Sequence, residues 1–309
     1  RMIREGYPEG HATALVACSS VLALLIPPSI PMIVFSITGG ISVGAAFLST
    51  IIPGIMLTVI YCLLNIWFLR NDTQIKVDKP LPFKEAAKGV VSTGYNAAFA
   101  LLMPLIILGA IYSGIATPTE AAAIAVVYAI PVGLFIYKGM SLRSLSAVTV
   151  RAVTMTGSIM AVLFFLFIMS RAMILEQVPR DMAQALLQIS ENKYVLLLLI
   201  NLLLLLIGMI VDDISGSVLA AIIFLPIINQ LGIDPIHFAA VVGVNLGLGN
   251  VSPPCAPMLY MAGGVSKLSL DRYITPTLKF LCLGHQPMVF LVTFVPELSL
   301  FLPRLLMGY

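Results

Sequence analysis

Charged residues are scarce in this sequence. Asp, Glu, Lys and Arg make up 10% of its 309 residues, and hydrophobic residues make up 60%. A soluble domain carries roughly 25% charged residues, because charge keeps its surface in water, so the composition excludes a soluble fold. Since about 18 apolar residues suffice to cross a bilayer, every long charge-free stretch predicts a membrane span. Three such stretches occur, between Glu9 and Arg70, between Lys88 and Glu120, and between Asp234 and Lys267.

The sequence also lacks paired cysteines and a strong charge of one sign. Its four cysteines lie in apolar segments without a CxxC pair or a histidine cluster: Cys18, Cys62, Cys255 and Cys282. We interpret them as small buried hydrophobic residues rather than disulfide partners or metal ligands. The net charge is only +3. We therefore expect the lipid bilayer, and not a nucleic acid, to be the chain's environment.

Two of the apolar spans are interrupted by double prolines. We expect spans at residues 12–38, 43–69, 97–115, 119–137, 153–175, 194–211, 235–265 and 277–302. The first contains Pro27-Pro28 and the seventh contains Pro253-Pro254. Proline removes an amide donor and clashes with the preceding turn, so both helices must break there. At membrane depth a broken backbone persists only where protein buries it or where it lines a cavity.

The distribution of Lys and Arg predicts the topology. The loops at 1–11, 70–96, 138–152 and 266–279 hold 13 of the 17 basic residues. Because cytoplasmic loops carry the excess, these four loops should share the cytoplasmic side. The fourth loop reaches that side only if residues 194–228 enter the membrane from outside and return. A polar interruption at 212–217 allows this turn, so we predict a re-entrant helical hairpin.

The two broken spans predict an internal repeat. An offset of 226 residues superposes the double prolines and also places Pro31 on Pro257 and His11 on His237. The topology runs the two spans in opposite directions, and such inverted repeats are typical of secondary transporters. A hairpin precedes the second broken span, but only eleven residues precede the first. We therefore expect the sequence to be an N-terminal truncation whose first half-site lies upstream.

Polar residues at the breaks are the candidate ligands for sodium and an organic acid. Half-helix ends at mid-membrane expose amide donors, which attract a carboxylate, and carbonyls, which coordinate sodium together with hydroxyls. We expect sodium to be bound by Ser215, Ser217, Asn250, Ser252 and backbone carbonyls, with no other cofactor. The full set of candidates comprises Ser19, Ser20, Pro27, Pro28, Ser29, Asp212, Asp213, Ser215, Gly216, Ser217, Asn245, Gly247, Gly249, Asn250, Ser252, Pro253 and Pro254.

Simpler structural roles compete with these interpretations. A proline kink between packed helices would also explain residues 245–254, and the two aspartates would also suit a helix end in water. Thr117-Pro118-Thr119-Glu120 predicts a helix cap. For the three histidines, packing at helix entries is favoured over a proton relay. The amphipathic segment 176–192 predicts an interfacial helix.

In combination these residues resemble the large membrane subunit of tripartite ATP-independent periplasmic (TRAP) transporters, the C4-dicarboxylate family. The matching segments are 26–31, 114–122, the leucine-rich run from Tyr194 into Asp212, 245–254 and 295–303. The resemblance covers nearly the whole chain. It implies an all-α, elevator-type sodium symporter of the bacterial inner membrane with re-entrant and discontinuous helices. It also implies two partners, a small membrane subunit and a periplasmic binding protein that delivers a C4-dicarboxylate, sialic acid or sugar acid.

The sequence departs from the family at three points. The family's N-terminal hairpin, with its Ser-Gly-Ser-like segment, is absent. Asp213 stands where the family has a small or hydroxyl residue, and residues 283–287 are more polar than the family's last helix. The first departure agrees with the gap that the internal repeat exposes.

We divide the chain into four parts and keep two other function classes open. Residues 1–69 end the first repeat, 70–193 form a cytoplasmic loop, scaffold helices and the interfacial helix, 194–276 form the second repeat, and 277–309 the C-terminal helix. An intramembrane hydrolase would use Asp212 or Asp213, although only His285 stands elsewhere in a span to complete a dyad. A passive channel would show uptake without saturation.

Overall fold

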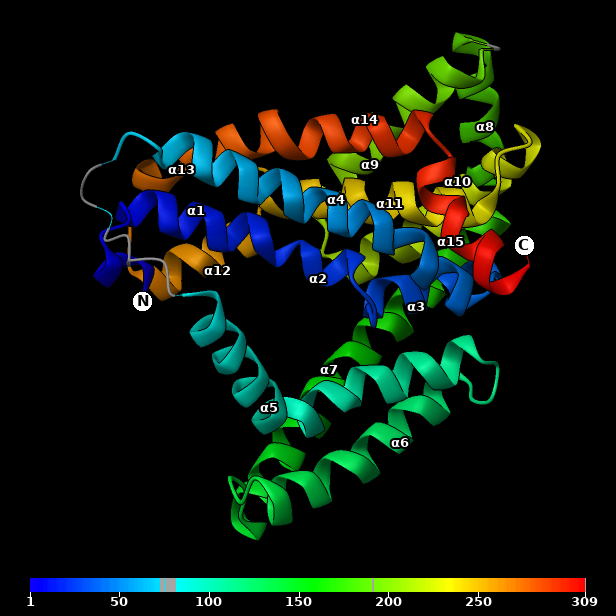
Figure 1. Cartoon of the computed structure of the whole chain (residues 1–309). Helices are drawn as coiled ribbons and strands as arrows, with labels where there is room; N and C mark the ends of the chain where they lie inside the picture. The colour runs from blue at the N-terminus through cyan, green and yellow to red at the C-terminus, as the bar shows by residue number, and fades with distance from the viewer. Residues whose placement is uncertain (73–74, 76–81, 191, 309) are drawn as a thin grey trace. The chain divides into compact units, whose positions relative to one another are not determined.

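The chain folds into helices only, as far as it is described. The computed structural model describes residues 1–72, 75, 82–190 and 192–308, and these contain no strand. Lys76 and Lys79 of the predicted second basic loop lie outside the described residues. Seven helical runs are long and apolar enough to cross a membrane, or eight if the bent α5 counts as one span. The chain is therefore an all-α, multi-pass membrane protein (Figure 1).

The described chain contains fifteen α-helices, one short 3-10 helix (η1) and two short π-helices (η2 and η3). In order they are η1 (Met2–Glu5), α1 (Glu9–Ser20), α2 (Leu22–Leu25), α3 (Ile30–Gly39), α4 (Val43–Leu69), α5 (Phe83–Tyr112), α6 (Pro118–Pro131), η2 (Val132–Ile136), α7 (Leu142–Leu175), α8 (Val178–Ile189), α9 (Lys193–Ile210), α10 (Asp213–Gln230), α11 (Pro235–Val251), α12 (Pro257–Ser266), α13 (Leu270–Phe280), η3 (Leu281–His285), α14 (Gln286–Phe294) and α15 (Glu297–Met307).

The helices form two compact units. Unit 1 contains Arg1–Lys76 and Phe164–Tyr309, and unit 2 contains Val77–Leu163. The predicted connecting segment 70–193 thus includes unit 2, while its last part, the end of α7 and the helix α8, belongs to unit 1. The predicted interfacial helix at 176–192 is confirmed as a helix, because α8 covers Val178–Ile189.

Both double prolines break a helix, as predicted. The residue before each pair is extended, with φ −91° and ψ 116° at Ile26 and φ −92° and ψ 128° at Ser252. A residue before proline avoids the helical region because the ring clashes with its backbone. Both Pro-Pro peptide bonds are cis. Each break is followed by a helix of ten residues, α3 in the first half and α12 in the second.

The predicted hairpin is present as α9 and α10. Lys193 and Tyr194, where α9 begins, line the same pocket as Gly232 and Asp234, which follow α10. The start of α9 and the end of α10 therefore lie at the same end of unit 1. The second arm is two residues longer than predicted, because α10 continues to Gln230.

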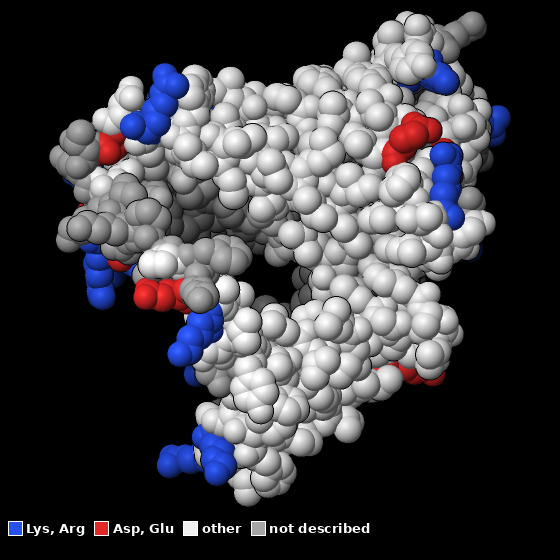
Figure 2. All heavy atoms as spheres, viewed as in Figure 1, with Lys and Arg blue, Asp and Glu red and all other residues white. Residues whose placement is uncertain are grey.

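The two broken spans run in opposite directions through unit 1. At one end α1 begins beside the start of α13, where Arg272 forms an ion pair of 3.7 Å with Glu9. At the other end Ile41, after α3, packs against Ile236, at the start of α11. On the face shown in Figure 2, charged side chains of unit 1 gather at these two ends and the band between them is uncharged. This arrangement matches a unit whose helices cross a bilayer.

Helix α11 lies at the centre of unit 1. Every residue from Ile236 to Val251 is buried, and α2, α4, α9, α10 and α14 pack around it. Helix association within a bilayer depends on close van der Waals packing, since lipid tails are as apolar as the side chains. Small residues allow that packing: a Cβ at Gly247 would collide with Val21, and one at Gly243 would lie 3.3 Å from Leu25 Cδ2.

Unit 2 consists of α5, α6, η2 and the first two thirds of α7. The predicted cap of α6 is confirmed, since Thr117 Oγ1 accepts from the Glu120 amide at 3.3 Å and Glu120 Oε2 accepts from the Thr117 amide at 2.7 Å. The Tyr128 hydroxyl donates to Phe99 O at 2.8 Å and ties α6 to α5. Large apolar side chains remain exposed on this unit, for example Val127 and Phe135.

The last predicted span, 277–302, is wrong in its bounds. The helical run begins at Leu270 and ends at Phe294, and α15 is a separate helix from Glu297. Pro296 has no amide proton to continue the ladder, and Val295 leaves the helical region with ψ 83°. The predicted span 153–175 also starts too late, because α7 begins at Leu142.

Candidate functional site

The hairpin tip is formed by residues 211–213. Val211 is extended, with φ −114° and ψ 152°, and ends α9. The Asp212 carboxylate accepts hydrogen bonds from the amides of Ile214 at 3.1 Å and Ser215 at 3.2 Å, so it caps α10. Asp213 is half-buried and its carboxylate accepts from the Ile214 amide at 3.1 Å. Asp212 thus has a local structural role as the cap, and Asp213 lies beside it in the first turn of α10.

The second helix break follows α11. The Ser252 hydroxyl donates to Leu248 O at 2.7 Å and its amide donates to Gly249 O at 2.9 Å, which closes the last turn. Beyond the prolines, Ala256 adopts a left-handed conformation with φ 33°. The Tyr260 hydroxyl on α12 donates to Pro254 O at 2.9 Å. Side-chain hydroxyls and the Ser252 amide thus pair the carbonyls of Leu248, Gly249 and Pro254 around the break.

The hairpin tip packs directly against the end of α11. A Cβ at Gly249 would collide with the Gly208 backbone, and a Cβ at Gly216 would lie 2.9 Å from Leu246 Cδ2. Glycine allows two backbones to approach this closely because it has no side chain. The predicted segments 212–217 and 245–254 are thus brought together, although they are more than twenty residues apart.

Asn250 has a buried side chain with nothing to bind. It is 1% exposed, and neither Oδ1 nor Nδ2 has a hydrogen-bond partner among the described residues. An unpaired buried amide costs about 1–3 kcal/mol, so such a group calls for a bound water, ion or ligand. Asn250 lies in the last turn of α11, where backbone carbonyls also lack helical partners. Amide and carbonyl oxygens suit a hard cation, and the Nδ2 protons suit a carboxylate.

Asn245 is already paired. Its Nδ2 donates to Asn201 Oδ1 at 2.7 Å and to Val241 O at 2.9 Å. Asn201 Nδ2 in turn donates to the Thr293 hydroxyl at 2.9 Å. The network joins α9, α11 and α14 inside the unit. Asn201 and Thr293 are not among the sequence candidates, although Asn201 is the lone polar residue in the apolar run 194–211 and that isolation was a usable signal.

The other candidate hydroxyls keep acceptor capacity. Ser217 Oγ donates to Asp213 O at 2.7 Å and is fully buried, and Ser215 is 4% exposed. A serine that donates its proton to a carbonyl still has lone pairs for a cation. The hairpin tip and the α11 end can therefore present several oxygen atoms in one region.

The first break also buries an unpaired polar group. Ser29 is 1% exposed and its hydroxyl has no partner among the described residues. Gly54 of α4 packs against Leu25 and Ile26, where its Cβ would lie 3.1–3.2 Å from their side chains. The Ser20 hydroxyl donates to Ala17 O at 2.7 Å, within α1. Ser19 lies on the same helix and is half-buried.

The two breaks flank α11 at different depths. Leu25, just before the first break, packs on Gly243. Asn250 lies seven residues further along α11, which is roughly 10 Å at 1.5 Å per residue. The candidates therefore form two separate groups, one around Pro27 to Ser29 and one around the hairpin tip with Asn250.

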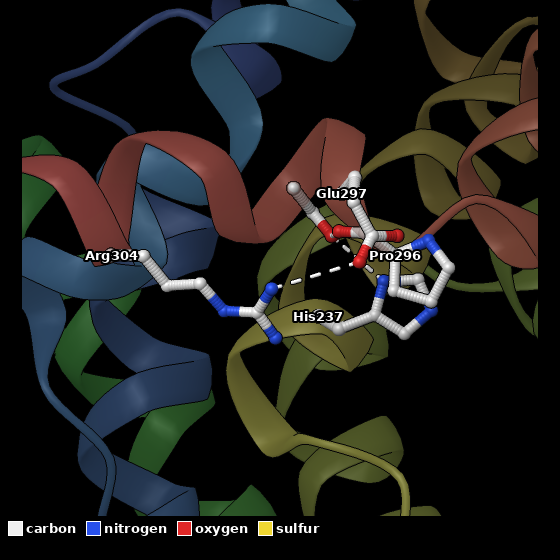
Figure 3. Close-up of polar contacts among 5 residues, drawn as sticks. His237, Pro296, Glu297 and Arg304 are labelled. Carbon is white, nitrogen blue, oxygen red and sulfur yellow. Dashed lines mark hydrogen bonds and ion pairs between the residues drawn. The ribbon is translucent and has the colours of Figure 1, made fainter.

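All three histidines bond to neighbouring helices. His11 Nε2 lies 2.9 Å from Asn65 Oδ1, and His237 Nδ1 lies 2.7 Å from Ser299 Oγ. Figure 3 shows His237 beside the corner between α14 and α15, where Arg304 pairs with Glu297 at 3.6 Å.

His285 is fully buried. Its Nε2 lies 2.9 Å from Val244 O and its Nδ1 lies 3.0 Å from the Tyr61 hydroxyl. Neither ring nitrogen is directed at the aspartates of the hairpin tip, so an intramembrane hydrolase gains no support.

The matching family and the similar proteins given below are all TRAP transporter permeases. The family described as "Tripartite ATP-independent periplasmic transporter, DctM component" matches residues 1–298. The isethionate TRAP transporter permease protein DctMQ of Oleidesulfovibrio alaskensis is 31% identical over 97% of this chain, which spans 46% of that protein. The C4-dicarboxylate TRAP transporter large permease protein DctM of Pseudomonas aeruginosa is 33% identical over 98% of the chain, and 70% of that protein is covered. The sialic acid TRAP transporter large permease protein SiaM of Vibrio cholerae is 32% identical, with the same coverage of 98% and 70%.

Proposed function

The chain belongs to the DctM family of TRAP transporter permeases and is not an enzyme, and from this premise we propose that it imports an organic acid by sodium-coupled secondary transport. The named relatives carry C4-dicarboxylate, sialic acid or isethionate in their names. All three are organic anions. We propose the same class of substrate here, in the inner membrane of a bacterium.

The observation that carries the sodium proposal is the unpaired amide of Asn250. It is buried in the last turn of α11, near the hairpin tip, and Pro254 has no amide proton to donate to the Asn250 carbonyl. Ser217 and Ser252 donate their hydroxyl protons to backbone carbonyls, whereas both polar side-chain atoms of Asn250 are buried and have no partner in the described structure. An ion bound there would join the hairpin to the broken helix, so its binding would be sensed by both.

We propose two protein partners. The combined name DctMQ of the isethionate relative supports a small membrane subunit. The words "periplasmic transporter" in the family description support a periplasmic protein that delivers the substrate. An elevator movement of unit 1 is part of the same proposal, because unit 1 holds the candidate site and forms a compact body of its own.

Sodium titration of substrate uptake tests the proposal. We expect Asn250→Ala, tested in the complete transporter with its binding protein, to raise the sodium concentration for half-maximal uptake about 5- to 100-fold. The reason is that a buried contact between the Asn250 oxygen and the sodium ion would contribute about 1–3 kcal/mol. The matched control is Asn245→Ala. This variant loses two hydrogen bonds, so its thermal stability should fall. The sodium concentration for half-maximal uptake by the protein that remains folded should not change.

The opposite pattern would contradict the proposal. If Asn245→Ala shifts the sodium dependence and Asn250→Ala does not, the ion is bound elsewhere. Uptake that does not saturate with substrate, or that needs no binding protein, would indicate a passive channel instead.

A further inference from the structure

A mixed polar and apolar pocket lies at the end of unit 1 away from the predicted cytoplasmic loops. It has a volume of about 660 Å³ and is formed by the ends of α3, α7 and α10 and the start of α8. Its polar lining residues are Thr38, Gln177, Arg180, Asn229 and Gln230. Its apolar wall is made by Ile174, Pro179, Ala183, Ala221, Ile222, Leu225 and Pro226. The proposed transport function does not use this pocket.

The pocket carries a positive charge. Among the described residues, Arg180 is the only charged one that lines it. Arg180 Nη1 donates to Gln177 Oε1 at 3.0 Å, which directs the guanidinium along the start of α8. Within the described residues Arg180 forms no ion pair, although Glu176 and Asp181 are close in sequence. Four of its five N–H donors are therefore available, and an arginine in this state suits a phosphate or carboxylate.

A second group in the pocket is also unsatisfied. Thr38 Oγ1 is buried and has no hydrogen-bond partner among the described residues. It comes from the last turn of α3, whereas Arg180 comes from α8. Gln177, which holds Arg180, adopts a left-handed conformation with φ 56°, rare for a residue other than glycine. The sharp turn at Gln177 is what places the start of α8 over the ends of α3 and α10.

The position of the pocket identifies the source of the anion. α3 and α10 belong to apolar runs that cross the uncharged band of unit 1, and both end at this pocket. Helix α8 is amphipathic, buries Ala183 and Leu186 against the unit, and exposes Ile189. The pocket thus lies where hydrocarbon gives way to headgroups. A soluble anion would use the arginine but not the apolar wall.

We propose that this pocket binds a membrane phospholipid. Arg180 and the Thr38 hydroxyl hold the phosphate, the amides of Asn229 and Gln230 contact the polar headgroup, and the apolar wall contacts the glycerol and the first acyl carbons. The lipid fills the space between α8 and the second arm of the hairpin, so it stabilises the position of α8 against α10.

Three short-chain probes distinguish the sources of binding. Native mass spectrometry of the detergent-purified full chain is carried out with dioctanoyl phosphatidylglycerol, with dioctanoylglycerol, which lacks the phosphate, and with glycerol 3-phosphate, which lacks the acyl chains. Dioctanoyl phosphatidylglycerol should bind at least tenfold more tightly than either of the others. Equal binding of dioctanoylglycerol, or equal binding of glycerol 3-phosphate, would overturn the proposal.

Two variants and a matched control assign the binding to this pocket. Arg180→Gln should weaken dioctanoyl phosphatidylglycerol binding five- to tenfold, and Thr38→Val two- to fivefold. Arg171→Gln removes the same charge from exposed α7, outside the pocket, and should leave binding unchanged. Equal binding by the Arg180→Gln and Arg171→Gln variants would overturn the proposal, as would unchanged binding by the Thr38→Val variant.

Discussion

The two broken helices of unit 1 have similar local structure and different surroundings. Each has an extended residue, a double proline, a ten-residue helix and a left-handed residue after it, Gly40 with φ 66° and Lys267 with φ 55°. In the first, α10 covers α3, and Met32 and Phe35 are fully buried. In the second, α12 and α1 share an open apolar groove of about 520 Å³, on which Val265 is 82% exposed. The two breaks thus share one local pattern, although among the described residues only the first has a helix over it.

The groove between α1 and α12 has no counterpart of α10 packed over it among the described residues. Inversion of the unit would map α10, which packs on α3 and α11, onto a helix that packs on α12 and α1. The described residues contain no such helix over the groove. An equivalent hairpin for the first half stays a prediction, and Met258, Met261 and Val265 are the side chains that it would cover.

The largest expected effect concerns the opposite directions of the two broken helices. Lys267→Cys, after α12, should react with a membrane-impermeant thiol reagent only from the cytoplasm, and Asn192→Cys, just before α9 at the base of the hairpin, only from outside. Arg143→Cys should react from the same side as Lys267→Cys. The experiment needs a background in which the exposed cysteines Cys62, Cys255 and Cys282 are replaced. Labelling of the 267 and 192 positions from one side would contradict the inverted arrangement.

An effect of intermediate size is expected at the contact between the end of α11 and the hairpin. Among the described residues, only the second break makes such a contact. Gly249→Ala places a methyl group against the Gly208 backbone and should destabilise the fold by about 1–3 kcal/mol, as overpacking does. Gly264→Ala on α12 is the matched control, because nothing lies within 4 Å of its Cβ. It should be neutral or stabilising by up to about 1 kcal/mol through helix propensity. Melting temperatures in detergent measure both, and equal values would mean that the tip does not dock on α11.

The smallest effect is expected for Ser29→Ala, which tests whether the first break also binds an ion. Ser29→Ala removes a buried hydroxyl that has no partner among the described residues, so the free energy of unfolding of the ion-free protein should change by less than about 0.5 kcal/mol. Ser36→Ala on the same helix loses a bond of 2.7 Å to Met32 O and should cost about 1 kcal/mol. Sodium should stabilise wild type more than the Ser29→Ala variant. Identical stabilisation of the two would leave the first break as a structural element only.

Much of the architecture could be predicted from the sequence because its causes are local. Charge-free runs marked the spans, the double prolines marked the breaks, and basic residues indicated the hairpin through topology. The cap at Thr117 and Glu120 was also visible as a motif. The break at Val295–Pro296 is not evident in the sequence, because apolar residues continue on both sides of it and a single proline can kink a helix without ending it.

The polar network inside unit 1 could not be predicted. Asn245 was named for its position beside the second break, but its partner Asn201 lies 44 residues earlier and Thr293 follows 48 residues later. Pairing across helices depends on which faces meet, and periodicity does not report this for helices that are apolar on every side. For the same reason the sequence could not separate Asn245, whose amide is paired, from Asn250, whose amide is not.

The bridge made by His285 has a consequence for energy coupling. Val244 O can only accept a hydrogen bond, so His285 Nε2 carries a proton and Nδ1 accepts the Tyr61 hydroxyl. A proton that entered at Tyr61 would reach a backbone carbonyl, which has no proton to pass on. The bridge is therefore a dead end for proton conduction from Tyr61 into α11.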